Sequence, residues 1–532
     1  MAPPPESELN FYGKIGSCWN DKMKKVILVS PSLWERKKKG WVPTYPSGVP
    51  PFPFAAIMLF AKILKNSGYD VKIIDGNLFD IDGWIEAIAN EVNDDTVCIG
   101  FSVMTNQVPL VHKVTKEIKN KFPKLFVIWG GFHPTLFPEQ TVDDDNIDIV
   151  VVNEATSTIT QLVDTLANGG DLSKVPGLYF KSGGKIVKTS NYIPDDISKL
   201  PFFDFSLIDS DRYSKNSFVF TEYLSSPEDI IFFPILTGLG CVNKCRFCIN
   251  VILNRSYRFK TAEEIVDRIE YLQKVYNANS FWFIDEDFFL NKKRLFRFLD
   301  LIEKRNLHFY RRASLRVNYF TENYITVDLA RRLEKNGLAI AVMGAECGSQ
   351  RMLDYINKGI TIKDTIRSAE VLSKTNIVAK YSFIVGLPGE TKEDIRDTYR
   401  LVLKIAKIKE NRDLVIFPFR PYPGSPIYEQ AKKEYTIYEP TKLEDWAKIE
   451  DYSEASGYIT YKKNPWFPDY REYERLRFID AHFFGFLKRK GLIARFFRFI
   501  VSIRFKFNFF NFLYFEKFCV IVAAFLAKRR RK

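Results

Sequence analysis

The sequence predicts two successive α/β domains followed by a basic, aromatic tail. Short apolar runs of buried-strand length alternate with helix-like stretches over residues 25–160, and a second series of the same kind covers residues 231–430. The length of 532 residues exceeds one ordinary domain, and 46% apolar with 27% charged residues is typical of folded globular chains. Around these domains we expect an N-terminal extension over residues 1–24, a connector over 161–230 and a C-terminal region over 431–532.

The first series predicts a doubly wound, Rossmann-like parallel sheet. A Pro- and Gly-rich loop after the first strand leads into an apolar helix near residues 54–66. Because a helical stretch separates the strands, they pair in parallel, and ligands bind at their carboxyl ends. The expected strands are Lys25–Ser30, Val71–Asp75, Val97–Phe101, Leu125–Trp129 and Ile149–Val152.

The second series predicts an open or partial (β/α)6 barrel. Six strands separated by amphipathic helices favour a barrel over a second nucleotide-binding sheet. In such a barrel the functional side chains lie at the carboxyl ends of the strands. The expected strands are Phe232–Leu236, Ser280–Ile284, Ala313–Val317, Ala339–Gly344, Lys380–Val385 and Leu414–Phe419.

The cysteines and histidines restrict the chemistry. Three of the seven cysteines fall within eight residues, which is unlike a disulfide framework. The opening MAPPPESELN lacks the basic and apolar regions of a signal peptide, so we expect reduced thiols and a cytoplasmic protein. Only four His are present, which excludes a His-rich metal site.

The net charge of +14 is concentrated in the tail. Residues 483–532 contain thirteen Lys and Arg and one acid, Glu516, a net charge of +12. The body is therefore nearly neutral, and we expect no nucleic-acid partner. Phe, Leu and Ile mixed with Lys and Arg favour a helix on an anionic membrane surface, peripheral at its inner face. The longest uncharged apolar run, Phe518–Ala527, is ten residues, whereas a span needs about 20. The alternatives are packing of the tail on the barrel and a tail anchor over Phe507–Ala527, which would bury Glu516 and Lys517.

The motif GLGCVNKCRFCIN directly follows the first strand of the second domain. Its thiolates, from Cys241, Cys245 and Cys248, can bind three irons of a cubane. An iron–sulfur cluster normally takes four cysteines, so the fourth iron is open to a small molecule. Lys244 and Arg246 add positive charge, which lowers thiolate pKa values and suits an anionic cluster. Zinc is the alternative, but a closed zinc site needs four ligands and no His lies within forty residues.

This motif, with the aromatic Phe247 before its last cysteine, resembles the signature of the radical S-adenosylmethionine (radical SAM) superfamily. The segments FIDEDFF, MGAECGS and FIVGLPGET resemble the same superfamily in order and spacing. The resemblance implies a [4Fe-4S] cluster on the three cysteines and S-adenosylmethionine at its open iron. Cys347 is expected to be a small buried residue instead of a ligand. The resemblance also implies cofactor-binding roles for Phe247, Asp285, Glu346, Gly386 and Pro388.

Residues 25–155 resemble the cobalamin-binding domain that precedes the barrel in one branch of that superfamily. The likeness lies in GFSVMT and GGFHPT, where small residues at strand ends let a flat macrocycle lie against backbone. The Asp-x-His-x-x-Gly pattern of an axial imidazole is absent, so we expect no His ligand on the lower cobalt face. A plain Rossmann-like scaffold is the alternative. The resemblance implies cobalamin-binding roles for Ser102, Thr105, Gly130, Gly131, His133 and Glu154.

Together the resemblances imply an enzyme that cleaves S-adenosylmethionine to a 5′-deoxyadenosyl radical, with electrons from a donor such as flavodoxin or ferredoxin. With cobalamin, the expected reaction is C-methylation of a hydrophobic or membrane-derived small molecule, such as a lipid-like substrate. Two alternatives stay open. One is oxidative cyclisation or rearrangement, as in the anaerobic porphyrin-ester cyclase, and the other is a non-catalytic iron–sulfur protein.

Overall fold

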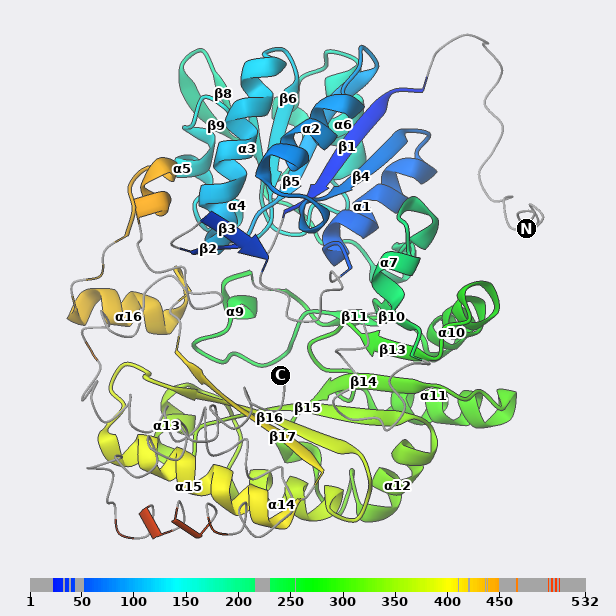
Figure 1. Cartoon of the computed structure of the whole chain (residues 1–532), viewed down its shortest axis with the longest axis vertical. Helices are drawn as coiled ribbons and strands as arrows, with labels where there is room; N and C mark the ends of the chain where they lie inside the picture. The colour runs from blue at the N-terminus through cyan, green and yellow to red at the C-terminus, as the bar shows by residue number, and fades with distance from the viewer. Residues whose placement is uncertain are drawn as a thin grey trace, which may run out of the picture.

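The structure is a computed structural model in which two α/β domains lie one above the other (Figure 1). Residues 1–22, and most of the predicted basic tail, lie outside the described part of the chain. The described residues are 23–448, except 32–33, 38–39, 44–51, 216–229, 254, 410, 420–421, 436 and 438, together with Trp466, Phe496, Phe499, Ile500, Ile503, Arg504 and Phe507.

The first domain is built on a seven-stranded sheet in the order β4-β1-β5-β6-β7-β8-β9. The first five strands in this order are parallel, which confirms the predicted doubly wound sheet. Each lies within one residue of its predicted bounds. These strands are β1 (Lys25–Ser30), β4 (Asp70–Asp75), β5 (Thr96–Ser102), β6 (Phe126–Gly130) and β7 (Ile149–Val151).

Helices cover both faces of this sheet. Successive residues of β1 belong in turn to two apolar clusters, one on each face, and all six are buried. Helices α1 (Ala55–Asn66) and α6 (Ile159–Ala167) cover one face, and α2 (Ile81–Glu91) and α3 (Val108–Lys121) cover the other. The strand order reverses between β1 and β5. The switch point, where such folds bind ligands, therefore lies at the carboxyl ends of these two strands.

The sheet continues through a hairpin that the sequence analysis missed. β8 (Leu178–Ser182) and β9 (Lys185–Lys188) extend it in antiparallel fashion, inside the range predicted as a connector. Both strands are short, and β9 is mostly exposed and carries a Lys at each end, so no apolar run marks it. Further along the connector, α7 (Asp211–Ser214) is tied to the sheet because Tyr213 donates a hydrogen bond to Asp75 at 3.0 Å.

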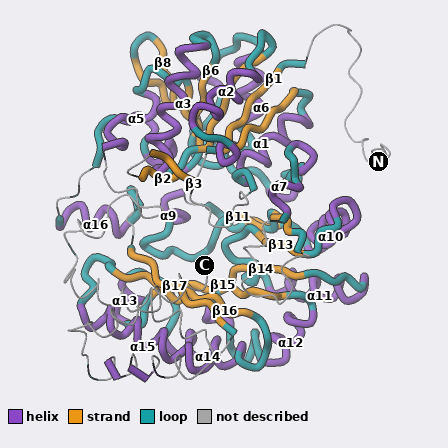
Figure 2. Tube along the Cα trace, in the orientation of Figure 1, coloured by secondary structure: helices purple, strands orange, loops and turns teal. Residues whose placement is uncertain are grey.

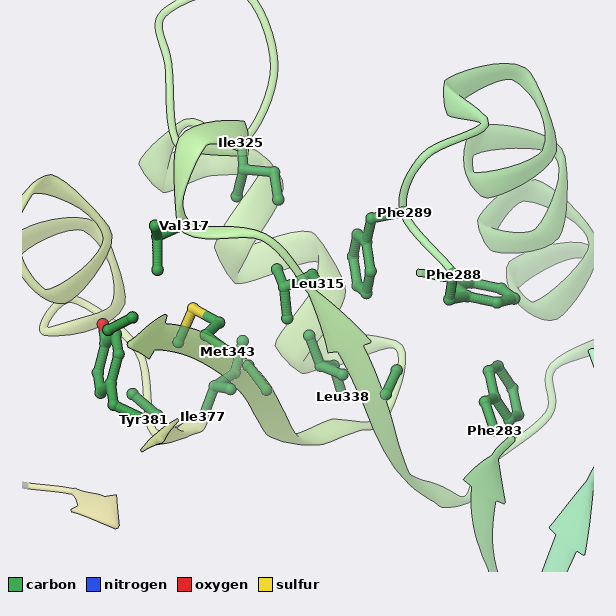
Figure 3. Packing of buried hydrophobic residues seen from close by; sticks show 14 of the residues in the cluster. Phe283, Phe288, Phe289, Leu315, Val317, Ile325, Leu338, Met343, Ile377 and Tyr381 are labelled. Atoms are coloured by element: carbon green, nitrogen blue, oxygen red, sulfur yellow. The ribbon is translucent and has the colours of Figure 1, made fainter. Parts of the chain in front are cut away.

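The second domain is an open, six-stranded parallel sheet in chain order, as predicted. Among the described strands the last does not pair with the first, so the barrel is partial. Its strands are β10 (Phe232–Ile235), β13 (Ser280–Phe283), β14 (Tyr310–Leu315), β15 (Leu338–Glu346), β16 (Val378–Val385) and β17 (Arg412–Pro418). Its main helices are α10 (Ala262–Tyr276), α11 (Lys292–Arg305), α12 (Val327–Lys335), α14 (Ile362–Leu372) and α15 (Lys392–Ile408). Buried side chains from the strands, from the helices and from the loops between them form the core, part of which Figure 3 shows.

Loop segments lie between the two sheets, together with the short helix α9 (Ile249–Leu253), as Figure 2 shows. After the barrel, α16 (Pro426–Glu434) crosses the predicted domain boundary at residue 430. The 3-10 turn Leu443–Lys448 then packs against α3, so the chain returns to the first domain. The remaining described elements are the hairpin β2 (Trp34–Lys37) and β3 (Gly40–Pro43), and the short helices α4 (Phe132–Leu136), α5 (Pro138–Val142) and α13 (Gln350–Tyr355).

Candidate active site

The three cysteines lie on a loop whose ends are held together by a short antiparallel pairing. β11 (Gly238–Leu239) precedes the cysteines and β12 (Arg258–Phe259) follows them. The segment after α13 anchors the middle of the loop. The Arg246 N–H donates to the Ile356 carbonyl at 2.9 Å, and the Asn357 side chain donates to the Lys244 carbonyl at 2.9 Å.

The three thiols are free and close enough to influence one another. Cys245 is buried, whereas Cys241 and Cys248 are partly exposed. The pKa of the Cys248 thiol is raised to about 11, mainly by burial and also by the neighbouring Cys245 and Cys241 thiols. In the described part of the chain, no three Cys, His, Asp or Glu side chains converge as ligands of one metal ion. In a cubane each thiolate binds its own iron, so three thiols on one loop suit three of the four irons.

The cation that faces these thiols is Lys358, which the sequence analysis missed. It predicted Lys244 and Arg246, but the Arg246 guanidinium turns toward Gln430 at 2.6 Å and lies 4.8 Å from the Tyr355 ring. Lys358, from the loop between α13 and α14, lies with Nζ 6.0 Å from the centre of the Phe247 ring. Nothing in the local sequence INKGIT distinguishes this lysine from a surface residue.

Glu346, at the carboxyl end of β15, is the partner of Lys358. The Lys358 ammonium donates to Glu346 Oε1 at 2.6 Å, and the two side chains are only 11% and 8% exposed. A Cβ on Gly344 would collide with Glu346 Oε1 and lie 2.8 Å from Lys358 Nζ. The glycine of the MGAECGS segment therefore provides the space that this ion pair occupies. Cys347 is buried and hydrogen-bonds the Ile384 carbonyl at 3.8 Å, which agrees with a packing role.

Acids at the carboxyl end of β13 hold unsatisfied acceptors. Both Asp285 oxygens, and one oxygen each of Glu286 and Asp287, are buried without a hydrogen-bond partner among the described residues. Burial raises the pKa of Asp285 to about 7, although Arg294 lies 3.5 Å away and acts in the opposite direction. Burial likewise raises the pKa of Asp287 to about 6. A cationic ligand such as S-adenosylmethionine would satisfy these acceptors, so this edge fits that group.

The loop after β16 uses its backbone groups within the chain. Gly386 adopts φ +83°, and its N–H donates to the buried Glu390 carboxylate. Its carbonyl accepts a hydrogen bond from Trp466 Nε1 at 2.9 Å, and Pro388 beside it is buried. Both the N–H and the carbonyl of Gly386 are therefore hydrogen-bonded within the chain. An adenine at Gly386 and Pro388, as predicted, would contact the surface of this loop without a hydrogen bond to Gly386.

In the first domain, Ser102 and Gly130 are neighbours at the carboxyl ends of β5 and β6, and both are half-buried. Gly131 follows with φ +98°, and a Cβ there would lie 2.8 Å from the Val103 nitrogen. The two loops interlock, because Val103 N–H donates to the Gly130 carbonyl at 2.7 Å. Gly131 therefore lets these two loops pack closely, because a side chain there would collide with the Val103 backbone.

His133 is placed inside the domain instead of at this edge. It is fully buried, and its Nδ1 lies 3.3 Å from Thr105 Oγ1. Its ring contacts Phe137 and the Trp446 ring from the returning C-terminal segment. Burial lowers the pKa of His133 to about 3, so the imidazole is neutral. Its Nε2 is buried without a hydrogen-bond partner among the described residues.

Glu154 connects the two domains. It follows β7, and its carboxylate accepts two hydrogen bonds from Arg258 of the cysteine loop, both at 2.6 Å. Arg255 lies 3.2 Å from the same carboxylate. The carboxylate of this predicted cofactor-binding acid is therefore paired with two arginines of the second domain. Across this contact, the carboxyl edges of the two parallel sheets face each other.

These two domains and the three-thiol loop define a radical SAM enzyme that carries a cobalamin-type domain, and comparisons with known proteins agree. Residues 235–402 match the radical SAM superfamily and residues 51–163 match the B12 binding domain. An "uncharacterized methyltransferase" of Pyrococcus horikoshii is 29% identical over 415 residues, which cover 77% of this chain and 83% of that protein. The anaerobic magnesium-protoporphyrin IX monomethyl ester cyclase of Rubrivivax gelatinosus is 24% identical over 73% of this chain and 68% of its own length.

The solved structure of the cobalamin-dependent S-adenosylmethionine radical enzyme OxsB, with aqua-cobalamin bound, has the same fold. It superposes with a TM-score of 0.65 at 16% identity, over 91% of this chain and 72% of that one. The chain belongs to the family of radical SAM enzymes with a cobalamin-binding domain. It is therefore an enzyme and not a non-catalytic iron–sulfur protein. The cofactors of this family are a [4Fe-4S] cluster, S-adenosylmethionine and cobalamin.

Proposed function

We propose that the protein is a cobalamin-dependent radical SAM methyltransferase that methylates carbon in a hydrophobic small molecule. The observation that carries the proposal is the Glu154–Arg258 contact, which holds the carboxyl edge of the first sheet against the cysteine loop of the second domain. When bound, the cluster with S-adenosylmethionine supplies a radical and cobalamin supplies a methyl group. Two cofactor sites on facing edges suit a reaction that needs both groups at one carbon.

The chain's own residues have distinct tasks in this proposal. Cys241, Cys245 and Cys248 hold the cluster, and the unsatisfied acids at the end of β13 orient the positively charged cofactor. Ser102, Gly130 and Gly131 offer backbone and a hydroxyl to the macrocycle. The loops and α9 between the sheets exclude water from the reacting carbon.

The test is product analysis with the full chain, anaerobically reconstituted and supplied with hydroxocobalamin, a one-electron reductant, deuteromethyl-labelled S-adenosylmethionine and an organic extract of membranes. A methyltransferase forms S-adenosylhomocysteine and 5′-deoxyadenosine together and places the labelled methyl group in an apolar product. If no extract component acquires the labelled methyl group and no S-adenosylhomocysteine forms, the result would count against methyl transfer.

The second candidate is oxidative cyclisation, which the similarity to the ester cyclase of Rubrivivax gelatinosus favours. The same assay separates the two functions. A cyclase forms 5′-deoxyadenosine without a matching amount of S-adenosylhomocysteine. In either case a small electron carrier, such as flavodoxin or ferredoxin, is the proposed donor to the cluster.

For the tail we propose contact with an anionic membrane surface, which would bring the enzyme to a lipid-like substrate. Four of the described tail residues, at spacings of three and four, expose large apolar side chains. The exposed fractions are 51% for Phe496, 61% for Phe499, 39% for Ile503 and 67% for Phe507. The first three of these residues are helical, and residues three or four apart lie on one face of a helix. No helix in the described part of the chain is long and apolar enough to cross a bilayer.

An apolar face within a segment of net charge +12 suits the boundary between headgroups and acyl chains of anionic lipid. Deletion of residues 483–532 is expected to abolish binding to anionic vesicles and to leave the iron content unchanged. Replacing Phe499 and Phe507 with Ser should weaken binding at constant charge, and high salt should weaken binding of the full chain. Equal binding to neutral and anionic vesicles would contradict the electrostatic part.

A further inference from the structure

The Lys358–Glu346 ion pair is oriented relative to the cysteine loop. Lys358 Nζ lies 6.0 Å from the Phe247 ring, and Phe247 stands between two of the three cluster cysteines. Glu346 is bonded to the same ammonium at 2.6 Å and belongs to β15, next to Cys347. The positive end of the pair therefore lies on the side of the cluster loop.

The neighbours of the two side chains agree with this orientation. Lys358 lies close enough to Cys245 and Cys248 for its charge to act on both thiols. Glu346 directly precedes Cys347, which is buried in the barrel core.

We propose that Lys358 and Glu346 form a fixed charge pair that sets the reduction potential of the cluster, with Lys358 favouring the reduced state and Glu346 opposing it. The proposal rests on the cluster of the proposed function but not on the methyl acceptor. Reduction adds one electron to the cluster, so a nearby cation stabilises the product and a nearby anion destabilises it. Both side chains are almost completely buried, so water screens them weakly.

The expected shifts follow from simple electrostatics. Two unit charges about 10 Å apart, at an effective dielectric constant of about 20, change an equilibrium by roughly tenfold. For a one-electron couple, a tenfold change corresponds to about 59 mV. Lys358→Met removes the cation and should lower the midpoint potential by about this amount. Glu346→Gln leaves the cation unpaired and should raise it by a similar amount.

The experiment is an anaerobic redox titration of the reconstituted full chain, followed by electron paramagnetic resonance, without S-adenosylmethionine, cobalamin or substrate. The two single variants should shift in opposite directions, and the double variant should return toward the wild-type potential. Lys358→Arg, which keeps the charge, should stay close to wild type. Iron content measured on each variant confirms that the cluster is present.

Lys380→Met is the matched control. Lys380 also forms an ion pair on the barrel sheet, with Asp413 at 2.8 Å, but near the start of β16, at the end opposite the cluster. The midpoint potential of the cluster in Lys380→Met should equal that of the wild type.

Single variants whose midpoint potentials shift in the same direction, or stay at the wild-type value, would overturn the proposal. A wild-type chain without any cluster would overturn the proposed function as well, so the two failures are distinguishable.

Discussion

The contact between Glu154 and Arg258 gives a quantitative prediction about how the two domains are held together. Glu154→Gln keeps the shape of the side chain but removes its charge. The Glu154 side chain is 6% exposed and that of Arg258 is 13% exposed, so water cannot take over the lost interactions. In the variant, two arginines of the barrel face a neutral amide in a buried interface.

The expected loss of stability follows from burial. Removing one partner of a buried, hydrogen-bonded ion pair typically costs about 3–5 kcal/mol, whereas an exposed pair contributes about 0.2–1 kcal/mol. We therefore expect Glu154→Gln to lower the free energy of unfolding by about 3 kcal/mol. The matched control is Glu303→Gln. Glu303 also accepts two hydrogen bonds from one arginine, Arg332, at 2.9 and 2.8 Å, but that pair is on the surface and should cost under about 1 kcal/mol.

The assay is urea unfolding followed by circular dichroism, applied to Glu154→Gln, Arg258→Met and the double variant. The double-mutant cycle isolates the pair, and contacting residues show coupling of about 0.5–3 kcal/mol. We expect a value near the upper end. Coupling below about 0.5 kcal/mol, with a loss for Glu154→Gln no larger than that for Glu303→Gln, would refute the assignment of this pair as the link between the domains.

Two further predictions concern the first domain. Because burial lowers the pKa of His133 to about 3, the unfolded chain binds a proton below pH ~6.5 that the folded chain does not bind; stability is thus lost as the pH falls. From this residue we expect the free energy of unfolding to fall by about 2 kcal/mol between pH 7.5 and 5, at about 1.36 kcal/mol per pH unit below ~6.5. In His133→Phe the urea midpoint should depend less on pH. Identical pH profiles of the midpoint in the variant and the wild type would exclude this role. Gly131→Ala places a residue with a Cβ at φ +98° and should lower the free energy of unfolding by about 2 kcal/mol. The variant should also retain less hydroxocobalamin in gel filtration. In Gly130→Ala the new Cβ would meet the Val151 carbonyl at an ordinary 3.5 Å, so equal losses in the two variants would contradict the geometry.

Most of the fold could be predicted from sequence because buried strands carry a local pattern. The parallel strands of the first sheet are almost continuous apolar runs, and β1 is buried on both faces. The hairpin of β8 and β9 was missed because it lies at an edge, where exposed polar residues remove that pattern. Its pairing with β7 is set by tertiary structure.

The site was predictable only where its residues are adjacent in sequence. The three cysteines and Phe247 lie in one short motif. Lys358 comes from a loop more than 100 residues later. Its position is set by the ion pair with Glu346 at the end of β15, which the local sequence does not reveal. Glu154 was chosen as a cofactor-binding acid; its partner Arg258, 104 residues away in the other domain, could not be read from the local sequence. His133 was chosen as a cofactor-binding residue, and Trp446 from the C-terminal segment buries it.

The most direct test of the account is the metal content of the cysteine loop. Anaerobically reconstituted wild-type protein should contain about four irons and four sulfides per chain, and S-adenosylmethionine should change the electron paramagnetic resonance spectrum of the reduced cluster because one iron lacks a protein ligand. Replacing Cys241, Cys245 and Cys248 together with Ala should abolish the cluster, whereas Cys347→Ala should keep it. Zinc in place of iron, loss of the cluster in Cys347→Ala, or a spectrum unaffected by S-adenosylmethionine would contradict the account.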